Sequence, residues 1–279
     1  MKLEYVLIEK KNDKTISADK ERIKKIFEEI YEKLDDIHIF VRGKRKLFEI
    51  KYKITCGTST SGEKADFIYN ITFEFENKDK MREADVLEKT NILFQNKIDE
   101  LRDYFLIVAN DGISTFYCNK IYPKYQNFER QLRHLIFKVV TRAYGCLWTS
   151  ETLSEEMKRN LKEEIKTRNG NKKADMLIQE ALHEMTMGQL IEYLFYGQSE
   201  IVLPDYIDEH LPIYKLKKMS KDELIALLEK GRRKSVWNLY LSEKFDIDEP
   251  KTKLRILKNN RNKVAHCKQF YYEDYELTA

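Results

Sequence analysis

The chain has 279 residues, enough for one large domain or two ordinary ones, and 42% of them are hydrophobic, which supports a real core. Lysine and arginine number 51 against 47 acidic residues, so the net charge of +4 excludes a polycation, and any nucleic-acid contact is expected to be a local patch. No apolar run is long enough to cross a membrane, no signal-peptide core opens the chain, and the four cysteines follow no metal-binding or disulfide spacing. We therefore expect a soluble, cytoplasmic protein with no metal site, no cofactor and no membrane partner.

Residues 1–121 alternate between strand and helix patterns. Residues 3–8 form a short apolar run that is typical of a buried strand, and apolar residues between positions 23 and 34 follow helical spacing. Strict alternation over 48–56 and again over 67–75, on either side of a turn-rich segment, predicts a hairpin with one buried face.

The rest of this half continues the same order. Apolar residues from Val86 to Phe105 predict a second helix, and Asn110-Asp111-Gly112 is typical of a hairpin turn between strands at 106–109 and 113–118. The order of elements predicts an α+β fold that begins with a ferredoxin-like α/β sandwich. That architecture hosts many functions, so we expect only RNA binding, partner binding or sensing from residues 1–121.

Residues 122–279 show helical spacing throughout and predict an all-α bundle of five or six helices. Asn127 is expected to cap the first of them, whose apolar stripe runs from Phe128 to Val140. Ser220-Lys-Asp-Glu223 is typical of a capping box that opens a helix over 224–229. Further helices are expected over 155–167, 174–185, 187–196, 236–241 and 251–266.

The last of these helices carries Arg261 and His266 with four residues between them. The pair is notable because a fixed cation beside a group that titrates near neutrality suffices to cleave RNA without metal. Five positions along a straight helix turn by about 140°, so the two side chains would not share a face. We therefore expect either a break at Asn259-Asn260 or a bend between the two residues.

The stretch Asn-Asn-Arg261-Asn-Lys-Val-Ala-His266 resembles the Arg-x4-His motif of HEPN-domain ribonucleases, a family of abortive-infection proteins, toxins and anticodon nucleases. The resemblance covers about residues 125–279 and is sharp at this motif. It implies a HEPN-like helical domain over 122–279, a homodimer with both side chains in a cleft between protomers, and a metal-independent endoribonuclease. It also implies a role in phage defence or as a toxin, with RNA, tRNA among the candidates, as substrate and an antitoxin or regulatory protein as a further partner.

In the chemistry that this resemblance implies, His266 serves as general base or acid and Arg261 stabilises the charge that grows on the phosphate. Asn262 orients the phosphate or the imidazole. One toxin subgroup of the family has a tyrosine two positions after the histidine, whereas this chain has Lys268 there. That difference puts control by nucleotide transfer to such a tyrosine in doubt and leaves the cleavage chemistry untouched.

Glu129 and Arg133 lie four residues apart on the first bundle helix and form either an ordinary helical ion pair or an auxiliary part of the Arg261–His266 cleft. Two basic runs are candidate RNA-phosphate contacts, although either is equally well explained as a solvated loop. They comprise Arg42, Lys44, Arg45 and Lys46 in a turn between strands, and Arg232, Arg233 and Lys234 near Trp237.

Three alternatives remain open. In the first, Arg261 pairs with an acidic neighbour and His266 caps a helix, so the motif is structural. In the second, the helical domain binds RNA or protein without cutting. In the third, the N-terminal sheet carries a metal nuclease or nucleotidyl cyclase, for which only Asp35, Asp36 and Asp111 are candidate ligands, and each is more typical of a turn.

Overall fold

The computed structural model describes residues 1–11, 18–59, 65–101, 103–169, 181–196, 203–231, 235–243, 246 and 248–278. The chain divides into two compact units. We call Met1–Tyr122 together with Asn262–Ala279 the sheet unit, and Pro123–Arg261 the helical unit. The division expected from the sequence was 1–121 and 122–279; in the structure the segment from Asn262 onward joins the sheet unit.

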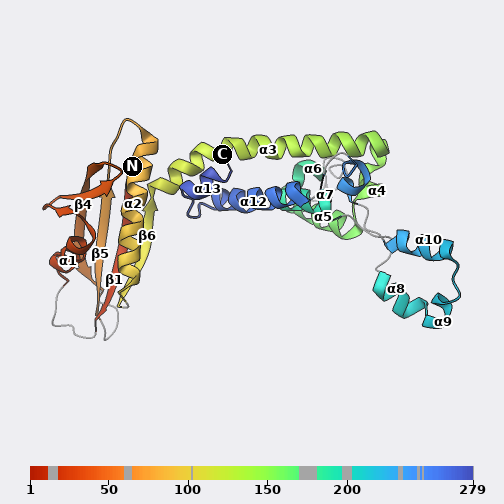
Figure 1. The fold of residues 1–279 in the computed structure, drawn as a ribbon, viewed down its shortest axis with the longest axis horizontal. Coiled ribbons are helices and arrows are strands. Elements are labelled where there is room, and N and C mark those ends of the chain that lie inside the picture. The colour runs from red at the N-terminus through yellow and green to blue at the C-terminus, as the bar shows by residue number, and fades with distance from the viewer. Residues whose placement is uncertain are drawn as a thin grey trace. The chain divides into compact units, whose positions relative to one another are not determined.

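The sheet unit is built on six strands, and its elements (Figure 1) are β1 (Lys2–Lys11), α1 (Lys20–Ile30), β2 (Lys33–Leu34), β3 (His38–Gly43), β4 (Lys46–Thr58), β5 (Ala65–Glu74), α2 (Lys80–Asp99) and β6 (Tyr104–Asp111). The strand order is β2-β3-β4-β5-β1-β6, and every neighbouring pair is antiparallel. The predicted α+β class is confirmed. The predicted hairpin is β4–β5, with Ile54 opposite Ile71.

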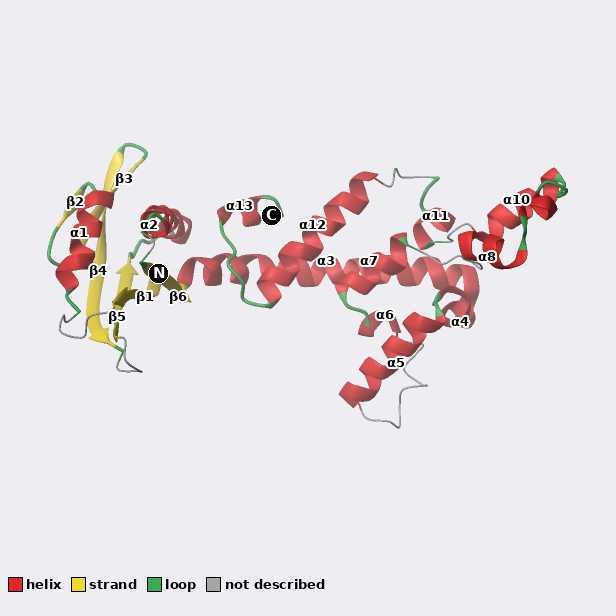
Figure 2. Ribbon diagram, turned by 90° about the horizontal axis from the view of Figure 1, so that it is seen from below, coloured by secondary structure: helices red, strands yellow, loops and turns green. Residues whose placement is uncertain are grey.

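Helices α1 and α2 cover one face of this sheet (Figures 1 and 2). Side chains alternate along each strand, so every second residue points to the helices and is buried. Phe73 of β5 lies between Phe27 of α1 and Phe94 of α2, with ring centroids 5.6 Å and 5.3 Å away. Tyr5 of β1 joins this aromatic cluster 5.2 Å from Phe94. The alternation that predicted the strands therefore also predicted the core.

The predicted hairpin turn at Asn110-Asp111-Gly112 is wrong, because a helix begins there: α3 spans Gly112–Tyr144. The Asp111 carboxylate accepts hydrogen bonds from the backbone N–H of Ile113 at 3.1 Å and of Ser114 at 2.9 Å, and from the Ser114 hydroxyl at 2.7 Å. These bonds satisfy donors that the first helical turn leaves open. A side chain at Gly112 would place a Cβ only 2.5 Å from the Lys2 carbonyl oxygen, so glycine is needed for this approach. The predicted helix start at Asn127 is consequently also wrong, since Asn127 lies inside α3.

The helical unit contains most of α3 and the elements that follow it, up to Arg261 in the last of them: a 3₁₀ turn (Gly145–Leu147), α4 (Trp148–Thr152), α5 (Glu155–Asn169), α6 (Ala181–Glu184), α7 (Met187–Phe195), α8 (Leu203–His210), α9 (Ile213–Leu216), α10 (Lys221–Gly231), α11 (Val236–Tyr240) and α12 (Asp248–Ala265). Its core gathers Ile136 and Val140 of α3 with Leu190 and Leu194 of α7 and Trp148. Among the described residues, no helix has both the length and the apolar character needed to cross a bilayer.

Most of the helices expected here are present. The helices expected over 155–167, 187–196, 236–241 and 251–266 correspond to α5, α7, α11 and α12. The capping box is confirmed, since the Glu223 N–H donates to the Ser220 hydroxyl at 3.2 Å and the Ser220 N–H to the Glu223 carboxylate at 2.7 Å. It opens α10 earlier than expected, at Lys221. Of the helix expected over 174–185, residues 174–180 lie outside the described part of the chain.

After α12 the chain completes the sheet unit and ends in a short helix, α13 (Tyr272–Glu276). Phe270 is fully buried, and its N–H donates to the Ser114 hydroxyl at 2.9 Å. The Tyr271 hydroxyl accepts a hydrogen bond from Asn91 of α2 at 3.0 Å. The Tyr272 N–H donates to Glu88 at 3.3 Å, and burial raises the pKa of that carboxyl above its usual value. The segment after His266 is thus anchored at three consecutive residues.

Removing the Asp111 side chain should destabilise the start of α3 and the anchor of Phe270 together. We expect Asp111→Ala to lower the free energy of unfolding by about 1–2 kcal/mol, the usual cost of losing a helix cap, in urea denaturation followed by circular dichroism. Asp111→Asn keeps a cap acceptor and is the control, with a smaller loss. Equal losses in the two variants would show that the carboxylate charge, and not the cap, stabilises this region.

Candidate functional site

Arg261 lies near the C-terminal end of α12 and is held from α3. Its Nε is 3.4 Å from a carboxylate oxygen of Glu129, which is only 9% exposed. The predicted break at Asn259-Asn260 is wrong, because α12 continues through both residues to Ala265. Asn260 is 5% exposed, and its burial on the inward side of α12 keeps it in the helix. The Arg261 side chain itself remains 31% exposed, and its two Nη groups carry the N–H donors that suit a phosphate.

Glu129 also pairs with Arg133, one turn further along α3, at 2.5 Å. Arg133 donates in addition to the carbonyl oxygens of Leu182 and Met185, both at 2.8 Å, so it ties α3 to the segment around α6. Glu129 is therefore the common acceptor of two arginines, one committed to structure and one partly exposed. The predicted helical ion pair between Glu129 and Arg133 is present, and Glu129 also contacts Arg261. An auxiliary role of these residues in a catalytic cleft stays a prediction.

His266 is the first residue after α12. Its backbone N–H donates to the carbonyl oxygen of Asn262 at 3.1 Å, and its side chain is exposed. Cys267 has a φ of 50°, the Cys267 N–H points to the Val264 carbonyl at 3.3 Å, and the Lys268 N–H points to the Lys263 carbonyl at 2.9 Å. This is the Schellman pattern that ends many helices, and it puts His266 at the C-cap position.

The division between the two units passes between Arg261 and Asn262. Arg261 therefore belongs to the helical unit with Glu129, while Asn262 and His266 belong to the sheet unit with the anchored tail. Asn262 is half-buried, and its carbonyl oxygen is the acceptor for His266. Arg261 is ion-paired and His266 lies at a helix end, as expected if the motif has a structural role. In these positions the Arg261 guanidinium and the His266 imidazole are also accessible to solvent.

The basic run Arg42–Lys46 forms the tight turn between β3 and β4, as the sequence predicted. Lys44, Arg45 and Lys46 are exposed, and the Arg45 backbone adopts a φ of 69°. Arg42 is also exposed and its Nε lies 3.4 Å from Glu32. The second predicted run, Arg232, Arg233 and Lys234, lies outside the described residues.

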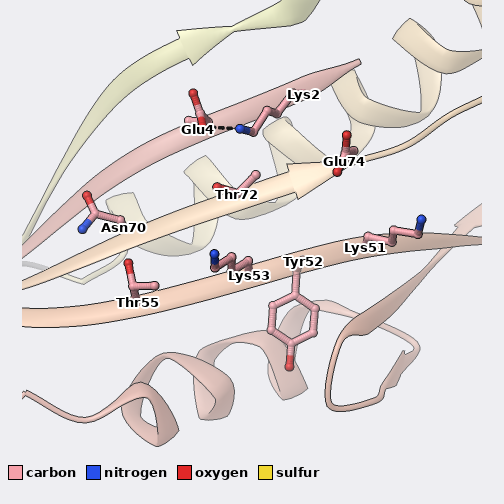
Figure 3. A pocket seen from close by; sticks show the side chains of 9 residues that line it. All are labelled: Lys2, Glu4, Lys51, Tyr52, Lys53, Thr55, Asn70, Thr72 and Glu74. Carbon is pink, nitrogen blue, oxygen red and sulfur yellow. Dashed lines mark ion pairs between the residues drawn. The ribbon is translucent and has the colours of Figure 1, made fainter.

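The open face of the sheet carries a hollow of about 340 Å³ between β1, β5 and β4 (Figure 3). Three lysines and two glutamates line it: Lys2 pairs with Glu4 at 2.6 Å, and Lys51 stands opposite Glu74 in the β4–β5 register. Tyr52 points to the other face, where its ring lies 5.3 Å from that of Phe27. The predicted catalytic residues do not line this hollow. Its lining residues are Lys2, Glu4, Lys51, Tyr52, Lys53, Thr55, Asn70, Thr72 and Glu74.

The carboxylates considered for a metal site on the sheet have other roles. The Asp111 carboxylate caps α3 and the Asp36 carboxylate lies 3.5 Å from Lys24, whereas Asp35 accepts a hydrogen bond from Tyr52 through its backbone carbonyl oxygen. In the part of the chain that the structure describes, no group of three or more histidine, cysteine, aspartate or glutamate side chains is placed to hold a metal ion.

Comparison with known proteins adds no assignment: no protein-family model matches the chain, and neither the curated proteins nor the solved structures contain a significant match. The sequence did not predict the hydrogen bonds from Arg133 to the carbonyl oxygens of Leu182 and Met185. Every residue has a backbone carbonyl group, so the pattern of side chains cannot indicate which one accepts a bond.

A double-mutant cycle on Glu129 separates its two roles. We expect Glu129→Gln to lower the free energy of unfolding by about 2 kcal/mol, because two arginines lose a buried counter-charge, partly offset by their access to water. The coupling energy measured with Arg133→Gln should exceed that with Arg261→Gln, as the shorter contact is the more buried one. A larger coupling to Arg261 would show that Glu129 serves mainly to hold the motif.

The left-handed backbone at Cys267 predicts a stabilising substitution. Cys267→Gly should raise the free energy of unfolding by about 1 kcal/mol, because glycine adopts this conformation without the steric cost that a Cβ imposes. Cys267→Ala keeps the Cβ and should leave stability nearly unchanged in the same thermal-unfolding measurement. If both variants gain equally, the thiol and not the backbone is the source of the effect.

Proposed function

We propose that this protein is a metal-independent endoribonuclease of the HEPN type, with Arg261 and His266 as its catalytic pair. The observation that carries the proposal is the contact between Arg261 and the buried Glu129. An isolated arginine on a helix surface samples many rotamers, whereas an ion pair through Nε orients the guanidinium and leaves its Nη edge for an anion. The fit of the Asn-Asn-Arg-Asn-Lys-Val-Ala-His stretch to the family motif supports the same assignment.

The reaction needs only the nucleophile that RNA brings with it. His266 accepts the proton of the ribose 2′-hydroxyl, the 2′-oxygen forms a bond to phosphorus, and the bond from phosphorus to the 5′-oxygen breaks. A proton returns to the departing 5′-oxygen from an imidazolium, which yields a 2′,3′-cyclic phosphate and a 5′-hydroxyl. Arg261 stabilises the negative charge on the phosphate oxygens during this step, and Asn262 orients the phosphate or the imidazole.

Two histidines serve this acid–base chemistry best, one to accept and one to return the proton. A homodimer supplies them, with two copies of Arg261 and His266 lining one groove. The exposed imidazole at the end of α12 supports such an arrangement, since a partner can approach it. Anchoring of Phe270, Tyr271 and Tyr272 fixes the backbone that follows His266 and so limits the directions that the imidazole can take.

The sheet unit is, in this proposal, a ferredoxin-like domain extended by two strands. The order β4-β5-β1-β6, all antiparallel, with α1 and α2 on one face, supports this assignment, and β3 and β2 add to the β4 edge. The exposed turn at Lys44, Arg45 and Lys46 together with Arg42 is suited to phosphate contacts that add affinity without reading sequence. The alternatives for this domain are partner binding and sensing.

The biological role follows from the family resemblance. Such enzymes act in phage defence by abortive infection or as toxins, where cleavage of tRNA or another RNA halts growth. A protein that cuts host RNA requires restraint, so the proposal includes an antitoxin or regulatory partner.

A second candidate is a HEPN-like module that binds RNA or protein without cutting. One observation favours it: Arg261 and His266 both occupy positions with an ordinary structural use, an ion pair and a helix C-cap. Under this alternative the motif stabilises the fold, and the helical unit serves only as a docking surface.

The deciding experiment incubates the full-length protein with total RNA in excess EDTA and maps the new ends. We expect cleavage that leaves 2′,3′-cyclic phosphates, a loss of at least about 10²-fold in rate for His266→Ala, and a clear loss for Arg261→Lys, which keeps the charge but not the fork. His210→Ala removes another exposed histidine, on α8, and should cut like the wild type.

Three results would contradict the proposal: ends with 3′-hydroxyls, cleavage that persists in His266→Ala, or RNA left intact by the protein at every concentration. The last result, combined with RNA retained in a filter-binding assay, would instead support the non-catalytic module.

A further inference from the structure

The outer side of α3 in the helical unit, from Pro123 to Tyr144, has a charge distribution that neither the core nor the Arg261 contact explains (green in Figure 1). One side of this stretch is buried, through Leu132, Ile136 and Val140. The opposite side carries three exposed cations, and we call them the α3 basic face: Arg130, Lys138 and Arg142.

No acid balances these cations along the helix. Glu129 is the single carboxylate between Pro123 and Tyr144, and it faces inward to Arg133 and Arg261. Within the described parts of the chain, no ion pair joins Arg130, Lys138 or Arg142 to a carboxylate. Elsewhere in this molecule exposed cations on helices commonly pair within one turn, as Lys253 does with Glu249 at 2.5 Å. The α3 basic face thus retains its positive potential.

The other side chains on this side of α3 suit a nucleic acid. Phe137 is 46% exposed and lies one turn from His134, which is itself exposed one turn from Arg130. An exposed ring among cations offers a base a surface on which to stack, while the cations contact phosphates. Gln126, Asn127 and Gln131 add exposed amides that can bond to sugar or phosphate oxygens.

We propose that the α3 basic face binds the sugar–phosphate backbone of a single-stranded RNA segment, and this inference rests on the proposed function. From Arg130 to Arg142 the helix rises about 18 Å, enough to follow a few nucleotides. Arg130 directly follows Glu129, the residue that contacts Arg261, and the two side chains point to different sides of α3, one exposed and one buried.

Charge also argues against a second copy of the chain as the occupant. A two-fold contact places the same surface on both partners, so three cations of one copy would meet three of the other. Such like-charge contact is unfavourable, whereas a polyanion gains from each cation and releases its own counterions.

The test measures binding of a fluorescein-labelled uridine 20-mer to His266→Ala protein, in which turnover is blocked, by fluorescence anisotropy at several salt concentrations. Neutralising two cations in Arg130→Gln/Lys138→Gln should weaken binding at least about tenfold and reduce the salt slope by about 1.4, since each phosphate contact on a single strand contributes about 0.7. Arg130→Lys/Lys138→Arg keeps the charge and should bind nearly as tightly as the parent. Lys217→Gln/Lys218→Gln removes two exposed cations that follow α9 and should change binding less than twofold.

Three outcomes would overturn the inference. Two are an unchanged affinity in Arg130→Gln/Lys138→Gln and an equal loss of affinity in Lys217→Gln/Lys218→Gln. The third is displacement of the RNA by polyglutamate at the same charge concentration, which would make the face a general site for polyanions or acidic proteins. The cleavage assay is independent of all three. If Arg130→Gln/Lys138→Gln weakens binding but the wild type does not cleave RNA, only the nuclease proposal is rejected. If the wild type cleaves RNA but Arg130→Gln/Lys138→Gln binds it normally, only this inference is rejected.

Discussion

The carboxylate of Asp111 is the constraint on which the sheet unit and its tail both depend. It satisfies the first N–H groups of α3 and holds the Ser114 hydroxyl, and that hydroxyl in turn accepts the N–H of the buried Phe270. One side chain therefore sets where β6 ends, where the longest helix begins and where the chain after His266 is attached. Because the helix dipole also favours a negative charge at this end, the cap and the electrostatics act in the same direction.

A short apolar run predicted β1. Alternation of apolar residues predicted the β4–β5 hairpin and its buried face, because every second residue of a strand points to the same side, as Tyr52 and Ile71 do here. The start of α3 was not predictable in this way. Asn-Asp-Gly suits a hairpin turn and a helix cap equally well at the local level. The choice between them is made by contacts with distant parts of the chain, namely the Lys2 carbonyl that approaches Gly112 and the Phe270 N–H that reaches Ser114.

The candidate site shows the same limit. Spacing along α3 predicted the Glu129–Arg133 pair, and the resemblance suggested that Glu129 faces the motif, but no pattern indicated that one buried carboxylate serves both arginines. The break expected at Asn259-Asn260 followed from the local preference of asparagine for caps and turns. Burial of Asn260 inside the helical unit outweighs that preference, and α12 stays continuous.

The assignment of residues 262–279 to the sheet unit bears on how the protein is made. Ribosomes release a chain from its N-terminus, and most domains fold as soon as their own residues have emerged. Here the strands and α2 emerge early, but the buried Phe270, which bonds to Ser114, and Tyr271, which bonds to Asn91 of α2, are translated after the whole helical unit. The sheet unit therefore matures last although it is synthesised first, and the backbone around His266 acquires its final form only at that moment.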